Sequence, residues 1–331
     1  MSTKTSRSAT RTFKKIAKAT GNKVSVVRRA IEDALKHGNL NGEFKFLTFA
    51  GLLPVHLPDG TKIAVLPDIH VPAHHKQIMW AVLRALKDFQ PDIVILIGDV
   101  ADCFAISAWP ADPGVTRNVQ AELEQSRELA DEIMEVSGAY WLFWIMGNHE
   151  DRMWRFLTNV APQLANIVNP TTREKAMAIH DLLGYGPDDH VTFLYDLSER
   201  GGFGGGIVVN GDTEYHHGFI VRPKPGASPR ADSDRTGRST THGHTHRAGM
   251  TVRETTTGEV VAVESGHLVD PRHPYLAYAN LLNNWHPAVT FDTIVGGKVH
   301  SEVLPIDQVE IDGQLRYVLS FKEKDYVSSD R

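Results

Sequence analysis

The chain contains little cysteine and no long apolar run. Cys103 is the only cysteine among 331 residues, so an internal disulfide is excluded and a reducing compartment is favoured. No apolar stretch approaches the length of a membrane-spanning helix, about 18 residues. The basic segment Met1–Thr20 also lacks the apolar stretch of a secretory signal. These absences argue against a secreted protein and against a membrane span, and they predict a cytoplasmic location.

The charges are unevenly distributed along the chain. Residues 1–40 contain ten Lys and Arg against two acidic residues, a net charge of +8. The whole chain has 35 basic and 40 acidic residues, so the rest carries 25 against 38, a net charge of −13. With 41% hydrophobic residues, the chain can form one large core and a small additional region. The basic segment favours a polyanionic partner such as nucleic acid.

The basic segment, residues 1–45, has the pattern of two short helices. Apolar residues at helical spacing precede the turn Gly21-Asn22, and Ser25 can cap a second amphipathic helix that ends at Gly38. Two helices around a glycine turn, with exposed lysine and arginine, are compatible with a helix-turn-helix that contacts phosphates. A helical hairpin packed on the main domain and a solvated tail fit the pattern equally well.

Three short apolar runs are predicted to form buried strands, and a polar cluster follows each of them. The runs are Ile63–Leu66, Ile93–Ile97 and Trp141–Ile145. The clusters are Asp68 with His70, Gly98-Asp99, and Gly147-Asn148-His149-Glu150. Because the carboxyl ends of neighbouring parallel strands meet at one edge of a sheet, we expect the three clusters to line one crevice.

Two further groups of histidines lie downstream, at His217 and in Gly243-His244-Thr245-His246. Carboxylates, an amide oxygen and imidazoles are ligand types that suit divalent Mn, Zn and Fe. The set is too large for a single ion, so a pair of cations is predicted. Such pairs, about 3.5 to 4 Å apart, stabilise the attacking and leaving oxygens of phosphoryl transfer.

Taken in order, the five motifs resemble those of the calcineurin-like metallophosphoesterases. They are Asp68-Ile69-His70, Gly98-Asp99-Val100-Ala101-Asp102, Gly147-Asn148-His149-Glu150, His217-Gly218 and Gly243-His244-Thr245-His246. A single short motif recurs by chance, but five in this order between residues 62 and 268 are specific. The resemblance implies a four-layer αββα sandwich, an α/β fold, over residues 60–321 with a C-terminal strand extension. Residues 1–45 would form a separate, small basic helical region.

The resemblance also implies a division of labour among the metal ligands. One divalent ion would be held by Asp68, His70 and His246, the other by Asn148, His217 and His244, and Asp99 would bridge both. A bridging carboxylate offsets the repulsion between two dications. Mn is the favoured metal, and Fe, Zn and Ni are alternatives. His216 would point to the opposite face of a strand from His217, so only one of the two can be a ligand.

Three residues beside the ligands are expected to act on the substrate. By resemblance, His149 would stabilise or protonate the leaving oxygen, and Asp102 would orient His149. A turn or helix-capping role for Asp102 is an equal alternative. Arg152 is expected to contact the phosphate, although an ion pair on a helix surface would also explain it.

Several other polar residues stay outside the expected centre. His74, His75 and His242 are expected to be loop or surface residues, whereas His267 can either contact substrate or pack. The segment Arg222–Arg238 is rich in arginine, proline and glycine and is expected to be a solvated loop. Its cations could alternatively bind the non-reacting part of an anionic substrate.

Apolar spacing predicts the elements between the motifs. Amphipathic helices are expected at Lys76–Phe89 and Val119–Val136. Shorter strands are expected at Val191–Tyr195, Ile207–Asn210, Thr213–His217, Met250–Val252, Val260–Val263, Val289–Ile294 and Arg316–Phe321.

The predicted activity is hydrolysis of a phosphate ester by in-line attack of a metal-bridging hydroxide. A phosphodiesterase or nuclease acting on nucleic acid is favoured, because the basic segment can bind a polyanion. A small-molecule or protein phosphomonoesterase is the alternative. The protein-phosphatase alternative is weaker, because Cys103 and Phe104 follow Asp102 where those enzymes have arginine and glycine. A DNA-binding regulator with a noncatalytic sandwich is an alternative of another class, but all the expected ligands are present.

Overall fold

The computed structural model describes most of the chain after the basic segment. The described residues are 48–108, 117–168, 170, 176–186, 189–195, 204–256, 258–276 and 284–329. The two helices expected within residues 1–45 lie outside them, so the division of the chain into a basic region and a sandwich domain stays a prediction. Among the described residues, no helix is both long and apolar enough to cross a membrane.

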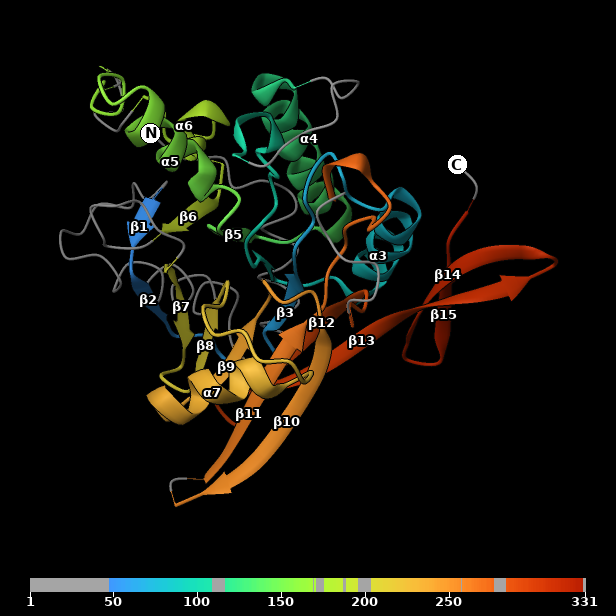
Figure 1. Cartoon of the computed structure of the whole chain (residues 1–331). Coiled ribbons are helices and arrows are strands. Elements are labelled where there is room, and N and C mark those ends of the chain that lie inside the picture. The colour runs from blue at the N-terminus through green and yellow to red at the C-terminus, as the bar shows by residue number, and fades with distance from the viewer. Residues whose placement is uncertain are drawn as a thin grey trace, which may run out of the picture.

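A nine-stranded sheet forms one half of the fold, and five neighbouring strands in it are parallel (Figure 1). In spatial order these are β1 (Thr48–Ala50), β6 (Val191–Tyr195), β5 (Trp141–Ile145), β4 (Ile93–Leu96) and β3 (Lys62–Leu66). Four antiparallel strands follow: β12 (Ala288–Val295), β13 (Lys298–Ile311), β14 (Gln314–Phe321) and β15 (Lys324–Val327). The C-terminal strands thus extend the main sheet.

A six-stranded sheet packs on the first. Its order is β10 (Ala248–Thr255), β11 (Gly258–Ser265), β9 (Ser239–His242), β8 (Thr213–His216), β7 (Gly206–Val209) and β2 (Leu52–Val55). The strands expected from apolar spacing are therefore confirmed, and those near Met250 and Val260 are longer than the sequence indicated.

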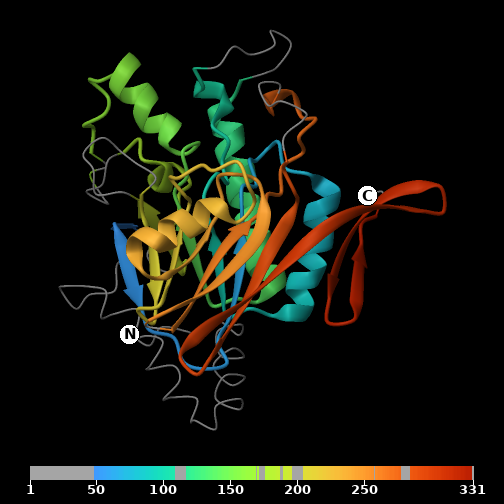
Figure 2. The same cartoon turned by 60° about the horizontal axis from the view of Figure 1, so that its bottom comes forward.

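Helices cover the outer faces of both sheets. The nine-stranded sheet carries α3 (Lys76–Phe89) and α4 (Val119–Ser137), and the six-stranded sheet carries α7 (Ala227–Thr236). In Figure 2, α7 and α3 are the gold and blue-green helices on opposite sides of the sheets. The predicted four-layer αββα sandwich is confirmed. The smaller elements are α5 (Asp151–Val160), α6 (Ile179–Leu182), and the 3₁₀ turns η1 (Phe104–Ile106) and η2 (Pro274–Leu276).

The alternation of side chains along the central strands explains why both faces of the nine-stranded sheet are covered. Ile63 and Val65 of β3 belong to the apolar cluster between the sheets, whereas Ala64 and Leu66 belong to the cluster beneath the helices. A strand that is apolar on both faces cannot face water on either side. The runs that looked uniformly apolar in the sequence are therefore the buried centre of the fold.

The expectation that Arg222–Arg238 is a loop was wrong in its second half, because α7 occupies Ala227–Thr236. Pro229 is the third residue of this helix, where a backbone N–H has no partner within the helix in any case. Proline is therefore tolerated at that position. Gly226 and Gly237 bound the helix, both with positive φ angles.

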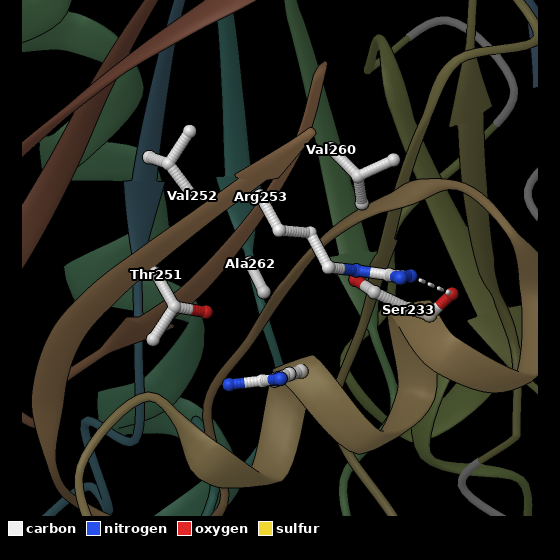
Figure 3. Close-up of a pocket in the computed structure, with 7 residues that line it drawn as sticks. Ser233, Thr251, Val252, Arg253, Val260 and Ala262 are labelled. Carbon is white, nitrogen blue, oxygen red and sulfur yellow. Dashed lines mark hydrogen bonds between the residues drawn. The ribbon is translucent and has the colours of Figure 1, made fainter. Parts of the chain in front are cut away.

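An ion pair connects α7 to the hairpin of β10 and β11. Arg253 of β10 reaches across a pocket beside the helix and donates to the carbonyl oxygen of Ser233 at 3.4 Å (Figure 3). Its Nη2 also lies 3.0 Å from Asp234 Oδ1. The other residues that line the pocket are Arg230, Thr251, Val252, Val260 and Ala262. The contact holds the helix over the six-stranded sheet.

We predict that Asp292→Asn stabilises the protein at neutral pH. Asp292 of β12 is fully buried and accepts a hydrogen bond from the Tyr215 hydroxyl at 2.7 Å, and burial raises its pKa from 3.8 to about 6. Stability is therefore lost as the pH rises from about 4 through 6, by roughly 3 kcal/mol once the carboxyl is ionised. Asparagine can accept the same bond without ionising.

Urea unfolding in EDTA at pH 5, 6, 7 and 8 would measure this effect. The advantage of the variant over the parent should grow between pH 5 and pH 7 and then level off. An advantage that does not change with pH would contradict the assigned ionisation.

Candidate metal centre

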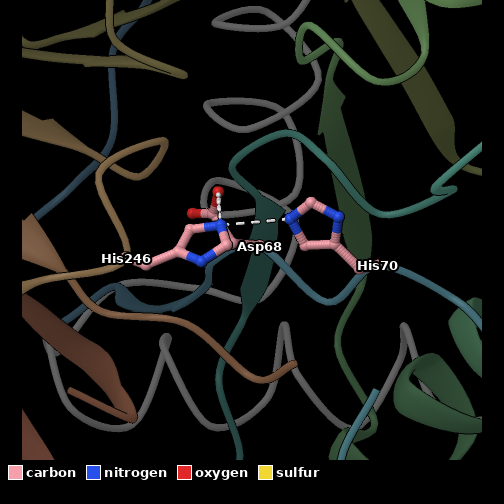
Figure 4. Close-up of side chains that lie close together, drawn as sticks. All are labelled: Asp68, His70 and His246. Atoms are coloured by element: carbon pink, nitrogen blue, oxygen red, sulfur yellow. Dashed lines mark hydrogen bonds and ion pairs between the residues drawn. The ribbon is translucent and has the colours of Figure 1, made fainter. Parts of the chain in front are cut away.

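Asp68, His70 and His246 form one buried group of potential ligands (Figure 4). Nε2 of His246 lies 3.3 Å from Oδ1 of Asp68 and 3.1 Å from Nε2 of His70. All three residues are at most 5% exposed. The first two follow β3 and the third follows β9, so the two sheets meet at this point.

A second group lies beside the first. Nε2 of His217 is 3.3 Å from Oδ2 of Asp99 and 3.1 Å from Oδ1 of Asn148, and the rings of His217 and His244 are 5.0 Å apart. Oδ2 of Asp99 is also 3.8 Å from Nε2 of His70 in the first group. The carboxylate of Asp99 therefore lies between the two groups.

The residues of this centre have an unusual backbone conformation. Positive φ angles occur at Asp68 (42°), His70 (55°), Asp99 (52°), His244 (66°) and His246 (58°). Such conformations cost on the order of 1–3 kcal/mol each for residues other than glycine, and they cluster at functional sites. Their concentration here indicates that the surrounding structure holds the side chains inward.

Two motif glycines allow the loops to approach each other. A Cβ atom at Gly147 would lie 2.1 Å from Oδ1 of Asp99, and one at Gly243 would lie 2.2 Å from Oδ2 of Asp68. Both values are far shorter than a van der Waals contact, so any other residue would displace a carboxylate. The glycines are therefore needed for close contact.

Glu150 is a structural residue to which the sequence analysis assigned no role. It is 1% exposed and accepts hydrogen bonds from the backbone N–H groups of Asp99, Val100, Ala101 and Gly147 at 2.7–3.0 Å. One carboxylate thus joins the loop after β4 to the loop after β5. The signal in the sequence was its place directly after Asn148 and His149.

The electrostatics of the centre depend on Asp99. Burial acts to raise its pKa, but His149 and His217 outweigh burial and hold it well below the usual value. Burial likewise acts to lower the pKa of His217, but Asp99 raises it to about 9. Burial lowers the pKa of His244 to about 4, so that imidazole is neutral near pH 7.

The donor atoms fit a pair of divalent cations. Two carboxylates are buried close together, and burial, together with the charge of Asp99, raises the pKa of Asp68. Nδ1 of the buried His246 has no hydrogen-bond partner among the described residues. Carboxylate and amide oxygens combined with imidazole nitrogens form a ligand set for transition metals, and cations would offset the repulsion between the buried acids.

His149, Asp102 and Arg152 form a connected group next to Asp99. Nδ1 of His149 lies 3.2 Å from the carbonyl oxygen of Asp102 and 3.4 Å from its Oδ1, and Oδ2 of Asp102 is 3.0 Å from Nδ1 of His70. Arg152 donates to Oδ1 of Asp102 at 2.7 Å, and its Nη2 is 3.1 Å from Nε2 of His149. Its partner is a buried carboxylate of the site, so a surface ion pair does not explain Arg152.

The remaining histidines take separate positions. His216 points away from His217, with its ring stacked on Phe219 at 5.0 Å and Nε2 4.0 Å from Asp232 of α7. His242 is buried and its Nδ1 lies 2.8 Å from the carbonyl oxygen of Gly243. His267 is buried against His246, with ring centroids 5.3 Å apart.

The pair His74 and His75 precedes α3. His75 lies in the loop before α3, as expected, but it is only 7% exposed because its ring packs on Tyr317 at 4.4 Å. The expectation of a loop or surface position was wrong for His242, which belongs to β9 and is 0% exposed. The approach of β14 buries His75, and α7 contributes to burying His242, contacts that no local pattern shows.

Comparisons with known proteins give a consistent result. The family model of the calcineurin-like phosphoesterases matches residues 61–233. The Gene 54 proteins of the Mycobacterium phages D29 and L5 are each 26% identical over 265 residues, covering 77% of this chain and 98% of theirs.

Two solved structures were also matched. Vacuolar protein sorting 29 of Cryptosporidium parvum has 13% identity and a TM-score of 0.37, covering 82% of this chain and 97% of its own. Vps29 of Chaetomium thermophilum has 10% identity and a TM-score of 0.39, and the match covers 81% of this chain and 98% of that structure. The family match extends over half of the sequence and includes four of the five motifs, so this chain belongs to the calcineurin-like phosphoesterases, a family of metal-dependent phosphoester hydrolases.

Proposed function

We propose that the protein is a phosphodiesterase that cleaves nucleic acid at a two-metal centre. The observation that carries the proposal is the position of Asp99 between two buried groups of donor atoms. One cation would be held by Asp68, His70 and His246, the second by Asn148, His217 and His244, and both by Asp99. When bound, such a pair polarises the phosphoryl group and acidifies a water molecule that attacks phosphorus in line.

His149 is proposed as the group that assists the leaving oxygen. Its Nδ1 faces the carbonyl and carboxylate oxygens of Asp102, so a proton on Nδ1 is held there and the other ring nitrogen, Nε2, is the one that would exchange its contact with Arg152 for the leaving oxygen. Nη2 of Arg152 lies beside this Nε2. A phosphate that reaches His149 would therefore also meet the guanidinium, which matches phosphate geometry well.

The substrate class rests on charge. The net charge of +8 in residues 1–40 favours a polyanion, whereas a small phosphomonoester needs no such segment. Phosphomonoester hydrolysis is therefore the second candidate. DNA binding without hydrolysis under any metal would instead favour a noncatalytic regulator.

We predict that metal removal abolishes hydrolysis of bis-p-nitrophenyl phosphate and that Mn restores it, because the donor groups supply no nucleophile of their own. Elemental analysis should find two metal ions per chain in the parent. The variant Asp99→Asn, which removes the bridging charge, should retain one metal ion or none, and its kcat should fall at least about 100-fold. The matched control is Asp131→Asn, whose carboxylate contacts Tyr185 at 2.9 Å. Two metal ions retained in Asp99→Asn would refute the bridging role.

We predict that His149→Ala impairs cleavage of DNA more than cleavage of a p-nitrophenyl ester. General acid assistance contributes about 10²- to 10⁴-fold, and p-nitrophenolate needs it less because it is a weak base. The values of kcat/KM for both substrates, with metal content checked, would show the difference. An equal loss on both substrates would argue for a binding role instead.

We predict that lysines of the basic segment contribute to DNA affinity through counterion release. The triple variant Lys14→Gln, Lys15→Gln, Lys18→Gln should flatten the slope of log K against log salt by up to about 2.7, if all three contact phosphates of a duplex. Fluorescence anisotropy between 50 and 200 mM salt would measure the slope.

A matched triple variant at exposed lysines elsewhere serves as the control. It carries glutamine at Lys87, Lys298 and Lys322. Equal slopes for parent and basic-segment variant would remove the main support for a nucleic-acid substrate.

A further inference from the structure

An exposed loop next to the metal centre combines apolar and basic side chains. It begins directly after His217 and Gly218, between β8 and α7, and we define it as residues Phe219–Lys224. Phe219 is 43% exposed and Val221 is 53% exposed. Two residues span at most about 7 Å, so the backbone of Phe219 lies within about 7 Å of the backbone of His217.

The charged residues of this loop are all basic. Arg222 and Lys224 are both exposed, and residues 218–227 contain no acidic residue. Arg155 of α5 donates to the carbonyl oxygen of Asn148 at 2.7 Å, but its charge is paired with Asp151 at 2.8 Å. An anionic chain that enters the centre would therefore meet the positive charge of the loop itself, on the side of His217.

Hydrogen bonds hold the loop in a defined position. The N–H of Arg222 donates to Ser228 at 3.0 Å, and its carbonyl oxygen accepts from Arg247. The carbonyl oxygen of Pro223 accepts from Asn284 at 3.1 Å. Such bonds reduce the ordering cost of binding.

Glu264 connects this loop to the metal centre. The fully buried carboxylate accepts from the N–H of Gly226 through Oε2. Its Oε1 accepts from the hydroxyl of Thr245 at 2.9 Å. Thr245 lies between His244 and His246, so the same side chain positions the two histidines and Gly226, which lies two residues beyond the loop.

A neighbouring ring holds the ring of Phe219 in place. It stacks on the buried ring of His216, with centroids 5.0 Å apart and an angle of 13° between the planes. An aromatic side chain in a basic surface is the arrangement by which proteins bind unpaired bases, because every base has a face that can stack. Bases within a duplex are already stacked on their neighbours.

We infer that the loop Phe219–Lys224 binds the nucleotides beside the scissile phosphate, and that the preferred substrate is single-stranded nucleic acid. A base stacks on Phe219 and Val221, and Arg222 and Lys224 contact the flanking phosphates. This inference rests on the proposed function and names its substrate class. It concerns binding, so it can be tested in the absence of metal.

The test is fluorescence anisotropy with a labelled single-stranded oligonucleotide and the same sequence as a duplex, in EDTA at 150 mM salt, on the full-length protein. The parent should bind the single strand more tightly. Phe219→Ala should weaken this binding by about tenfold, as expected for the loss of one base–aromatic stack. Phe219→Trp should restore it. Arg222→Gln with Lys224→Gln should weaken binding and lower its dependence on salt.

Val295→Ala is the matched control, because Val295 is 55% exposed at the end of β12 and lies outside the loop. Equal affinity of parent and Phe219→Ala for the single strand, or tighter binding of the duplex, would overturn the inference. Hydrolysis is measured separately with bis-p-nitrophenyl phosphate and Mn. No hydrolysis there would refute the proposed function, whereas the binding result decides the inference on its own.

Discussion

The geometry of the centre depends on one buried carboxylate that is not among the proposed ligands. Glu150 accepts backbone hydrogen bonds from both strand-end loops that carry Asp99 and Asn148. Burial and the charge of Asp99 raise the pKa of Glu150, and the hydrogen bonds from Ala101 and Gly147 act against that rise, so these bonds favour the ionised carboxylate that joins the loops. The N–H of His149 adds a further connection by donating to Oδ1 of Asp99 at 2.8 Å, so the two loops are held together and the donor atoms converge.

A second buried carboxylate has the corresponding role on the other sheet. Glu264 holds Thr245 between the two histidines that follow β9 and also the end of the loop before α7. The centre is thus assembled from two halves, each fixed by a glutamate, and Asp99 and His217 meet across the junction at 3.3 Å. Rigid support of this kind keeps donor atoms in place before a cation or substrate binds.

Much of the fold followed from apolar patterns. The run Ile93–Ile97 predicted a buried strand because it is apolar on both faces, and β4 lies at the centre of the sheet. The segment Arg222–Arg238 misled because its prolines and glycines resemble those of a loop, although Pro229 occupies a position where a helix tolerates proline. His242 misled for another reason, since it belongs to β9 and contacts from distant elements bury it.

The sequence by itself determined the elements, the family and the side chains that could ligate metal, because these follow from local spacing and from short ordered motifs. Only the tertiary structure decided which atoms meet. The contacts of Asp102 and the hydrogen bonds of Glu150 and Glu264 join residues as far as 51 positions apart. Such contacts arise from the packing of two sheets and from burial of charge, and no local pattern of residues records them.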